Sequence, residues 1–129
     1  MVVMATHNTL GSQGEQLACE FLIKQGFIVR EMNWRLNHLE IDIVAQRPGE
    51  NLLHIVEVKT RTSDEHYDPM SAINRKKILN LVNAANGYVH HYQLRMGIQY
   101  DVILIVGRPE NAKITYIPRA FQPPLRTYR

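Results

Sequence analysis

The chain has 129 residues, a length typical of one domain. Its composition, 45% hydrophobic and 21% charged, excludes intrinsic disorder over most of its length. No stretch approaches the ~18–20 uninterrupted apolar residues of a membrane span, and residues 1–6 lack the pattern of a signal peptide. We therefore expect a cytoplasmic protein. The single cysteine, Cys19, excludes an intrachain disulfide and a zinc site built on cysteines, and it fits a reducing compartment.

Charge is mildly positive, because fifteen Lys and Arg residues face twelve Asp and Glu residues and give a net charge of +3. Two parts of the chain carry a local excess of positive charge. Arg75-Lys76-Lys77 forms a basic group in mid-chain, and no acid follows Lys113. This distribution permits a polyanionic partner without requiring one.

The first half of the sequence predicts one helix and three strands. Residues 11–25 have apolar side chains at helical spacing, and Gly26 ends this helix. Residues 27–33 favour a strand, and residues 35–38 a turn. Residues 39–45 alternate as a strand with two unlike faces, and the Pro48-Gly49 loop separates them from the mostly apolar run 52–60, which is typical of a central strand.

The second half predicts a helix and one or two strands. Asp68-Pro69 is a helix-start signal, and an apolar stripe continues to about Tyr92. Residues 100–106 read as an interior strand, residues 113–117 as a short edge strand, and 118–129, with three prolines, as an irregular basic tail. The order α-β-β-β-α-β plus an edge strand predicts a single α/β domain over 1–129. Its core, about 11–117, is a central mixed sheet flanked by helices.

Charged residues interrupt two strands that otherwise read as core. Glu40 with Asp42, and Glu57 with Lys59, are two residues apart, so each pair shares a face of its strand. Burying an unpaired carboxylate costs several kcal/mol, so such acids usually have a partner or a metal. If the two strands form a hairpin, Asp42 and Glu57 are equally distant from the centre of its loop. They should therefore lie opposite each other.

Two convergent carboxylates and a backbone carbonyl offer the oxygen ligands that Mg²⁺ prefers. A nearby lysine can orient or deprotonate a metal-bound water, or neutralise charge that develops on a phosphate. These groups suit phosphodiester hydrolysis. The alternative is a plain ion pair between Lys59 and either acid, which would only stabilise a strand end.

The combination of these motifs resembles a known family. Glu-Ile-Asp-Ile-Val-Ala at 40–45, a Pro-Gly loop and His-Ile-Val-Glu-Val-Lys-Thr-Arg at 54–61 are similar to the YraN-like family of uncharacterised bacterial proteins. The resemblance spans about residues 11–106 and includes Gly14-Glu15, Lys77 and Tyr100-Asp101-Val102. It implies a restriction-endonuclease-like, PD-(D/E)xK, fold similar to archaeal Holliday-junction resolvases.

The resemblance also implies roles for individual residues. Asp42, Glu57 and the carbonyl of Val58 would hold Mg²⁺ or Mn²⁺, and Lys59 would support the attacking water. Glu15 would complete or support the metal site. The sequence departs from the family at Leu39, where glycine is usual, and the larger side chain could crowd the approach of a substrate to the backbone.

Several of these residues also have ordinary structural interpretations. Ser12 and Glu15 have the spacing of a capping box, which would explain Glu15 without a metal. Glu40 is more typical of a solvated acid. Arg61 could reach a phosphate or lie at the surface, and Asp101 could lie near the site or cap a loop. Arg75, Lys76 and Lys77 fall early in the second helix, where they could bind nucleic acid or simply be solvated.

Two functional hypotheses remain from the sequence. The first is a metal-dependent nuclease acting on DNA, including branched or structured DNA; a homodimer would fit it, because cutting a junction needs two active sites. The alternative is a non-catalytic module of the same fold that binds nucleic acid or a protein. The six histidines give no zinc-binding pair, and dinucleotide, P-loop and serine-hydrolase motifs are absent.

Overall fold

The computed structural model describes residues 10–62 and 73–124. In chain order the elements are α1 (Leu10–Lys24), β1 (Ile28–Leu36), β2 (Leu39–Gln46), β3 (Leu52–Arg61), α2 (Arg75–His91), β4 (Gly97–Val106), the short 3₁₀ helix η2 (Pro109–Asn111) and β5 (Lys113–Phe121). The predicted order of helices and strands is confirmed. In the described part of the chain, no helix is long and apolar enough to span a membrane.

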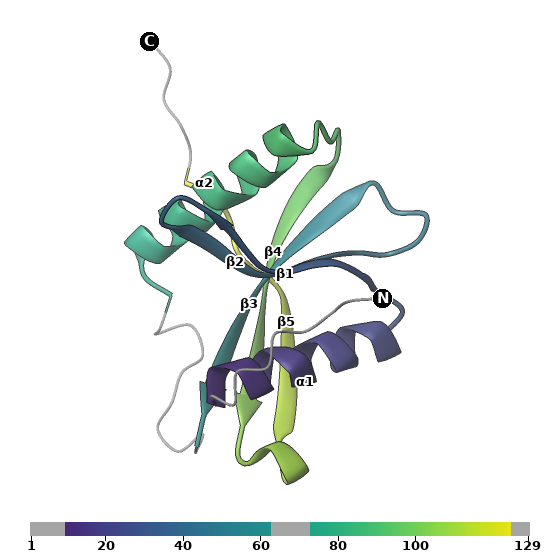
Figure 1. Cartoon of the computed structure of the whole chain (residues 1–129), viewed down its shortest axis with the longest axis vertical. Helices are drawn as coiled ribbons and strands as arrows, with labels where there is room; N and C mark the ends of the chain where they lie inside the picture. The colour runs from purple at the N-terminus through teal and green to yellow at the C-terminus, as the bar shows by residue number, and fades with distance from the viewer. Residues whose placement is uncertain (1–9, 63–72, 125–129) are drawn as a thin grey trace.

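The five strands form one mixed sheet in the order β1-β2-β3-β4-β5. Neighbouring strands are antiparallel except for β3 and β4, which are parallel. A parallel pair needs a crossover connection, and α2 lies within the one that joins β3 to β4. Figure 1 shows the result, with α2 on one side of the strands and α1 on the other.

Two apolar clusters hold these layers together. On one face, α2 packs against β2, β3 and β4 through buried residues that include Leu81, Ala85 and Tyr88. On the other, α1 packs through Ala18 and Leu22 against residues of β2, β3 and β4. A sheet covered on both faces explains why β3 is buried continuously from Leu53 to Glu57 and β4 from Tyr100 to Ile105. One helix on each face, as predicted, is confirmed.

The described part of α2 begins later than the sequence signal indicated. Asp68-Pro69 lies outside the described residues. Ile73 and Asn74 are not helical, and Asn74 is the N-cap, where its side chain accepts a hydrogen bond of 2.8 Å from the backbone N–H of Lys77. An Asn at this position satisfies one of the free donors of the first turn. The helix start is therefore fixed directly before the basic group 75–77.

The prediction of a short edge strand followed by an irregular tail from Pro118 is wrong for residues 118–121. β5 continues to Phe121 and pairs with Tyr100 of β4. A proline is tolerated because β5 is an edge strand, whose outer side needs no hydrogen-bond donor. The register shifts between Tyr100 and Val102, and Arg119 has φ 51° at this irregularity. The sequence pattern missed residues 118–121 of this strand because the prolines favoured an irregular tail from Pro118.

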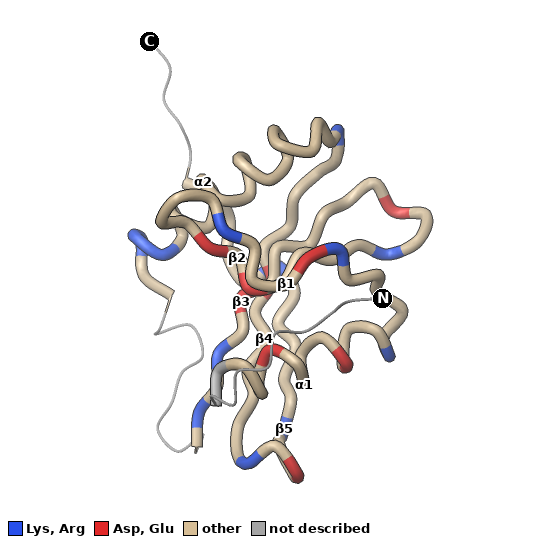
Figure 2. Tube along the Cα trace, in the orientation of Figure 1, with Lys and Arg blue, Asp and Glu red and all other residues tan. Residues whose placement is uncertain are grey.

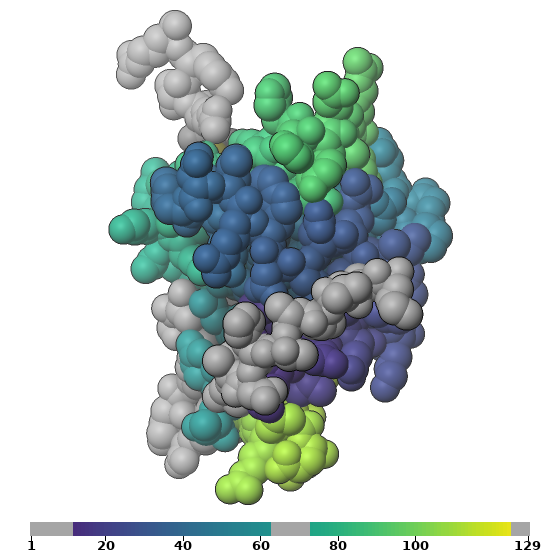
Figure 3. Space-filling model, in the orientation of Figure 1, coloured from purple at the N-terminus to yellow at the C-terminus, as the bar shows by residue number. Residues whose placement is uncertain are grey.

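The first hairpin is also longer than predicted. β1 continues to Leu36, which pairs with Leu39, and only Asn37 and His38 form the turn. Asn37 has φ 56°, a conformation that asparagine tolerates better than most residues. Seen from the side drawn in Figure 3, this hairpin lies between α2 and α1.

Gly14 controls how closely α1 approaches the sheet. A Cβ at this buried position would overlap Cγ2 of Thr60 on β3, a branched side chain with little freedom to move. Glu15 follows directly in the sequence, so this contact also sets the position of Glu15 relative to β3.

We expect Gly14→Ala to lower the free energy of unfolding by about 1–3 kcal/mol, although alanine is the better helix former. The matched control is Gly87→Ala in α2, whose Cβ would come too close only to the flexible end of Leu36, 2.6 Å away, and would make an ordinary contact with Trp34 at 3.9 Å. Because Leu36 is 37% exposed and can shift, this variant should be neutral or slightly stabilised. Urea denaturation of both variants checks the expectation, and equal effects of the two changes would contradict it.

Candidate active site

Asp42 lies where β2 separates from β3. The two strands pair through Ile43↔Val56, Val44↔Ile55 and Ala45↔His54, which is the register predicted from the centre of the loop. At the end of this ladder Oδ2 of Asp42 accepts a hydrogen bond of 2.9 Å from the backbone N–H of Val58. The carboxyl group thus replaces strand pairing at the fork between β2 and β3.

The alternation of side chains between the two faces of β2 is interrupted at the same residue. Ile41 belongs to the cluster on the α2 side, whereas Ile43 belongs to the cluster on the α1 side. Residues two apart in a regular strand share a face, so β2 must twist sharply around Asp42. This twist leaves the Asp42 carboxyl between the two layers, where groups from α1 and β3 can both reach it.

Glu57 on β3 is the second acid of the site, and two lysines contact it. Its side chain is only 4% exposed, and its Oε2 lies 3.1 Å from Nζ of Lys59 and 2.9 Å from Nζ of Lys77. Lys59 is two residues along the same strand, as predicted. Lys77 comes from the first turn of α2. The two lysines therefore compensate the charge of one buried carboxylate oxygen.

The contact with the buried carboxyl group of Glu57 changes the acidity of Asp42, which is itself half-buried. Burial and the neighbouring charge of Glu57 raise the pKa of Asp42 to about 8, although the hydrogen bond from Val58 opposes this shift. The side chains of Asp42 and Glu57 are also close enough to share a hydrogen bond. At neutral pH the pair can therefore hold one proton between its two carboxyl groups.

Glu15 on α1 joins the same group of acids. Burial raises the pKa of Glu15, a hydrogen bond from Asn33 opposes the rise, and the charges of Glu40 and Glu57 add to it. The Glu15 side chain also shares a hydrogen bond with Asp42. The capping box predicted for Ser12 is wrong, because α1 begins at Leu10 and Ser12 lies inside its first turn.

The basic residues predicted from the sequence separate into different surroundings. Lys77 contacts Glu57, whereas Arg75 and Lys76 are exposed at the start of α2. Arg61 lies at the end of β3 and donates to the carbonyl of Thr60 at 2.7 Å. In Figure 2 the acidic positions of α1, β2 and β3 lie near the middle of the molecule, and basic positions of β3 and α2 lie to one side of them.

Lys77 is half-buried, and its surroundings favour the charged form. Burial lowers the pKa of Lys77, but the hydrogen bond to Glu57 and the charges of Glu57 and Asp42 outweigh burial and leave the pKa raised. The acids of the site thus stabilise the charged form of Lys77.

Glu40 and Leu39 lie beside the site. Glu40 is exposed and forms an ion pair of 3.6 Å with Arg35, which agrees with its interpretation as a solvated acid. Leu39 packs against the cluster on the α2 side.

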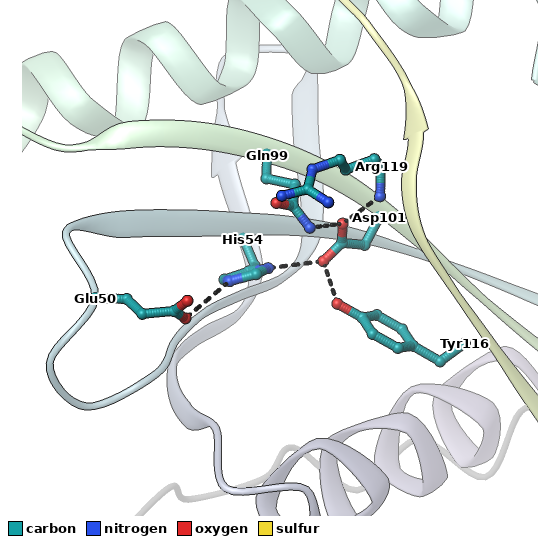
Figure 4. A network of polar contacts seen from close by, with 6 residues as sticks. All are labelled: Glu50, His54, Gln99, Asp101, Tyr116 and Arg119. Carbon is teal, nitrogen blue, oxygen red and sulfur yellow. Dashed lines mark hydrogen bonds and ion pairs between the residues drawn. The ribbon is translucent and has the colours of Figure 1, made fainter.

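Asp101 takes no part in the acidic group and instead joins three strands in a separate network (Figure 4). It is fully buried; its Oδ2 accepts from the hydroxyl of Tyr116 at 2.6 Å and lies 2.8 Å from Nδ1 of His54, and its Oδ1 accepts from the backbone N–H of Arg119 at 3.0 Å. Burial raises the pKa of Asp101, but these bonds and one from Gln99 outweigh it and leave the pKa lowered. The network fixes the irregular end of β5, and the partners of Asp101 lie in β3, β4 and β5, so neither a place beside the acids nor the cap of a loop describes this residue.

Sequence reasoning missed two contacts of the site. The bond between Asn33 and Glu15 joins β1 to α1, and the contact between Lys77 and Glu57 joins α2 to β3. The one signal in the sequence was an asparagine near the end of a strand, a residue type that is depleted in strands. In the structure Asn33 has φ 54°. Nothing in the spacing of Lys77 distinguished it from Lys76 except the family resemblance.

The donor atoms of the site fit a hard divalent cation. Asp42 and Glu57 supply two adjacent carboxylates, and Mg²⁺ is usually held by one or two carboxylates with waters and substrate phosphates. Within residues 10–62 and 73–124, no three acidic, histidine or cysteine side chains converge as a metal-binding group. The geometry therefore offers a two-carboxylate site and not a closed cage.

The raised pKa of Asp42 predicts a stability that depends on pH. In the unfolded chain this carboxyl ionises near its ordinary pKa of 3.8, whereas in the folded protein it keeps its proton to about pH 8. Folding therefore takes up a proton between these values, and stability is lost as pH rises through this window. Asp42→Asn removes the ionisation but keeps an acceptor for Val58. Without divalent cations, we expect the variant to exceed the wild type in stability at pH 8 by on the order of 5 kcal/mol.

The difference should shrink towards pH 4, and urea denaturation across this range measures it. Glu40→Gln is the matched control, because it neutralises an exposed acid of the same strand. A stability difference for Asp42→Asn that is the same at pH 4.5 and pH 8 would contradict the assignment.

Comparison with solved structures places this geometry in a known fold. The chain is similar to Archaeoglobus fulgidus Hjc, described as a Holliday junction resolvase from an archaeal hyperthermophile, with a TM-score of 0.53 and 22% sequence identity. The match covers 84% of this chain and 77% of that protein. The five-stranded mixed sheet with flanking helices is thus the restriction-endonuclease-like fold expected from the sequence.

Sequence comparison identifies the relatives. A protein of Bacteroides thetaiotaomicron is 42% identical over 122 residues, covering 95% of this chain and 99% of the relative. A protein of Flavobacterium psychrophilum is 43% identical over 118 residues, covering 92% of this chain and 98% of the relative. Both are described as UPF0102 proteins, and the model of that family matches residues 14–105. The chain therefore belongs to the uncharacterised protein family UPF0102.

Proposed function

We propose that this protein is a divalent-metal-dependent nuclease that hydrolyses phosphodiester bonds in DNA. One observation carries the proposal: half-buried Asp42 and buried Glu57 form a carboxyl pair at the fork of the sheet, and Lys59 contacts Glu57. The pKa of Asp42 is raised to about 8, and strongly shifted pKa values of this kind cluster at functional sites. The fold shared with a junction resolvase supports the same reaction class.

Asp42, Glu57 and the backbone carbonyl of Val58 are the groups that would hold Mg²⁺ or Mn²⁺. When bound, such an ion lowers the pKa of a coordinated water and polarises a phosphoryl oxygen. Asp42 has to give up its proton to become a ligand, since only the carboxylate form binds a metal. The hydrogen bond from Val58 holds its Oδ2 in place.

Lys59 would act on the water and on the phosphate. Its ammonium group lies 3.1 Å from Oε2 of Glu57, and its side chain is 19% exposed, so it stays close to the acids and can still reach a substrate. From this position it can orient the attacking water and stabilise the negative charge that grows on the phosphoryl oxygens.

Glu15 would position Asp42. It shares a hydrogen bond with that side chain and is itself bound by Asn33. A group that holds a ligand in this way fixes the orientation of the ligand and tunes its basicity. We therefore assign to Glu15 a supporting role beside the two ligands.

Branched DNA is the substrate that we consider first, because the similar archaeal protein is described as a Holliday junction resolvase. Junction cleavage by a chain of this size would use two copies, one for each strand. Exposed Arg75 and Lys76 at the start of α2, together with Arg61 at the end of β3, supply cations for phosphate contacts beside the acids.

Cleavage of junction, duplex and single-stranded DNA in Mg²⁺ or Mn²⁺ tests the proposal. We expect the wild type to cut at least one of these substrates. Asp42→Ala and Lys59→Ala should each lower the rate by about 10²-fold or more, because each removes a group that acts on the reacting phosphate. Glu20→Gln, which neutralises an exposed acid of α1, is the control and should retain the rate.

Absence of metal-dependent cleavage of every DNA form would refute the enzymatic proposal. The sequence also allows a non-catalytic binding module, which would give a different experimental result. DNA binding would then survive Asp42→Ala, and replacing Lys76 and Lys77 together would reduce the salt dependence of binding, because fewer counterions are released.

A further inference from the structure

Lys77 stands out because it makes a close contact inside the site from a separate element of the fold. Its Nζ lies 2.9 Å from Oε2 of Glu57, closer than Nζ of Lys59 at 3.1 Å, and both lysines contact the same oxygen. The other basic residues of the α2 start, Arg75 and Lys76, are exposed. One lysine of three adjacent cations is thus directed onto the acid.

The start of α2 fixes this arrangement. The side chain of Asn74 caps the helix by accepting from the N–H of Lys77 itself, at 2.8 Å. The first turn of α2 contains no acid, so the helix offers Lys77 no nearby carboxylate of its own. The cap therefore holds the backbone from which the Lys77 side chain reaches Glu57 on β3.

A divalent cation bound at Glu57 would compete with the contact of Lys77. Two ammonium groups already face Glu57, and a doubly charged ion on the same carboxylate would lie within a few ångströms of both. Like charges at such distances repel strongly where water is scarce. One ammonium group must then move away. Lys59 is held on the same strand and is 19% exposed, whereas Lys77 is 41% exposed and can turn outwards.

We propose that Lys77 is a positioning residue that serves as the counter-ion of Glu57 in the metal-free protein and is displaced when a divalent cation binds. The inference rests on the proposed metal site at Asp42 and Glu57. It adds a coupling between cation binding and the surface, because the displaced ammonium group becomes available to a phosphate of the nucleic acid only when the cation is in place. The positive charge exposed at the surface would then increase when the cation binds.

Mn²⁺ titration by calorimetry, without DNA, tests the competition. Lys77→Met removes the competing ammonium group, and we expect it to bind Mn²⁺ about 3- to 10-fold more tightly than the wild type. Lys76→Met is the matched control, because it removes the same charge one residue away without a contact to Glu57, and its Mn²⁺ affinity should stay within about twofold of the wild type.

A second measurement follows the displaced group directly in the wild-type protein. An acetylating reagent, read out by mass spectrometry, should modify Lys77 several-fold faster when Mn²⁺ saturates the protein, while the rate at Lys76 stays unchanged. In Asp42→Asn, which lacks the metal-binding carboxylate, Mn²⁺ should leave the rate at Lys77 unchanged. This readout needs no substitution at Lys77 and remains decisive if Lys77→Met does not fold.

The outcomes separate this inference from the proposed function. If Mn²⁺ binds and Asp42→Asn abolishes binding, but Lys77→Met binds no more tightly than Lys76→Met or acetylation of Lys77 does not respond, the counter-ion role is refuted and the metal site stands. If Asp42→Asn binds Mn²⁺ as the wild type does, the metal site itself is wrong, and the role of Lys77 falls with it.

Discussion

The carboxyl groups of Asp42 and Glu57 lie together at the point where β2 leaves β3, with Glu57 buried and Asp42 half-buried. Two acids in contact repel each other, and the protein meets this cost with a proton on the pair, a backbone hydrogen bond to Asp42 and two lysines on Glu57. The backbone hydrogen bond and Lys59 come from β3, whereas Lys77 comes from α2. The twist of β2, the start of α2 and the approach of α1 at Gly14 are all needed to bring these groups to the same place.

The sequence was sufficient for the parts of this site that depend on local pattern. The alternation in β2 and the symmetrical loop after it gave the correct register, because a slip of one residue would have exposed the apolar face of β2. It was insufficient where the geometry depends on long-range packing. The contact of Lys77 with Glu57 joins residues of two elements, and the bulge of β5 depends on the buried carboxylate of Asp101. Prolines suggested an irregular tail, yet an edge strand accommodates Pro118.

The starts of the helices show the same difference between local pattern and long-range packing. Ser12 and Glu15 satisfied a local rule for a cap, but α1 starts two residues earlier and Glu15 is directed to Asp42. For α2 the described cap is Asn74, which lies directly before the basic group and so determines which of three cations faces the acids. Membership of the UPF0102 family and the resolvase-like fold agree with the resemblance seen in the motifs, while the chemistry of the acidic pair carries the functional proposal.

The central claim is that the Asp42–Glu57 pair binds a divalent cation in exchange for a proton. Calorimetric titration of Mn²⁺ at pH 7, in two buffers of different ionisation enthalpy, measures the affinity and the number of protons released in one experiment. The account predicts release of about one proton per bound ion by the wild type, since the pKa of Asp42 is about 8, and an affinity at least about tenfold weaker for Asp42→Asn. Equal binding by the two proteins, or binding without proton release, would contradict it.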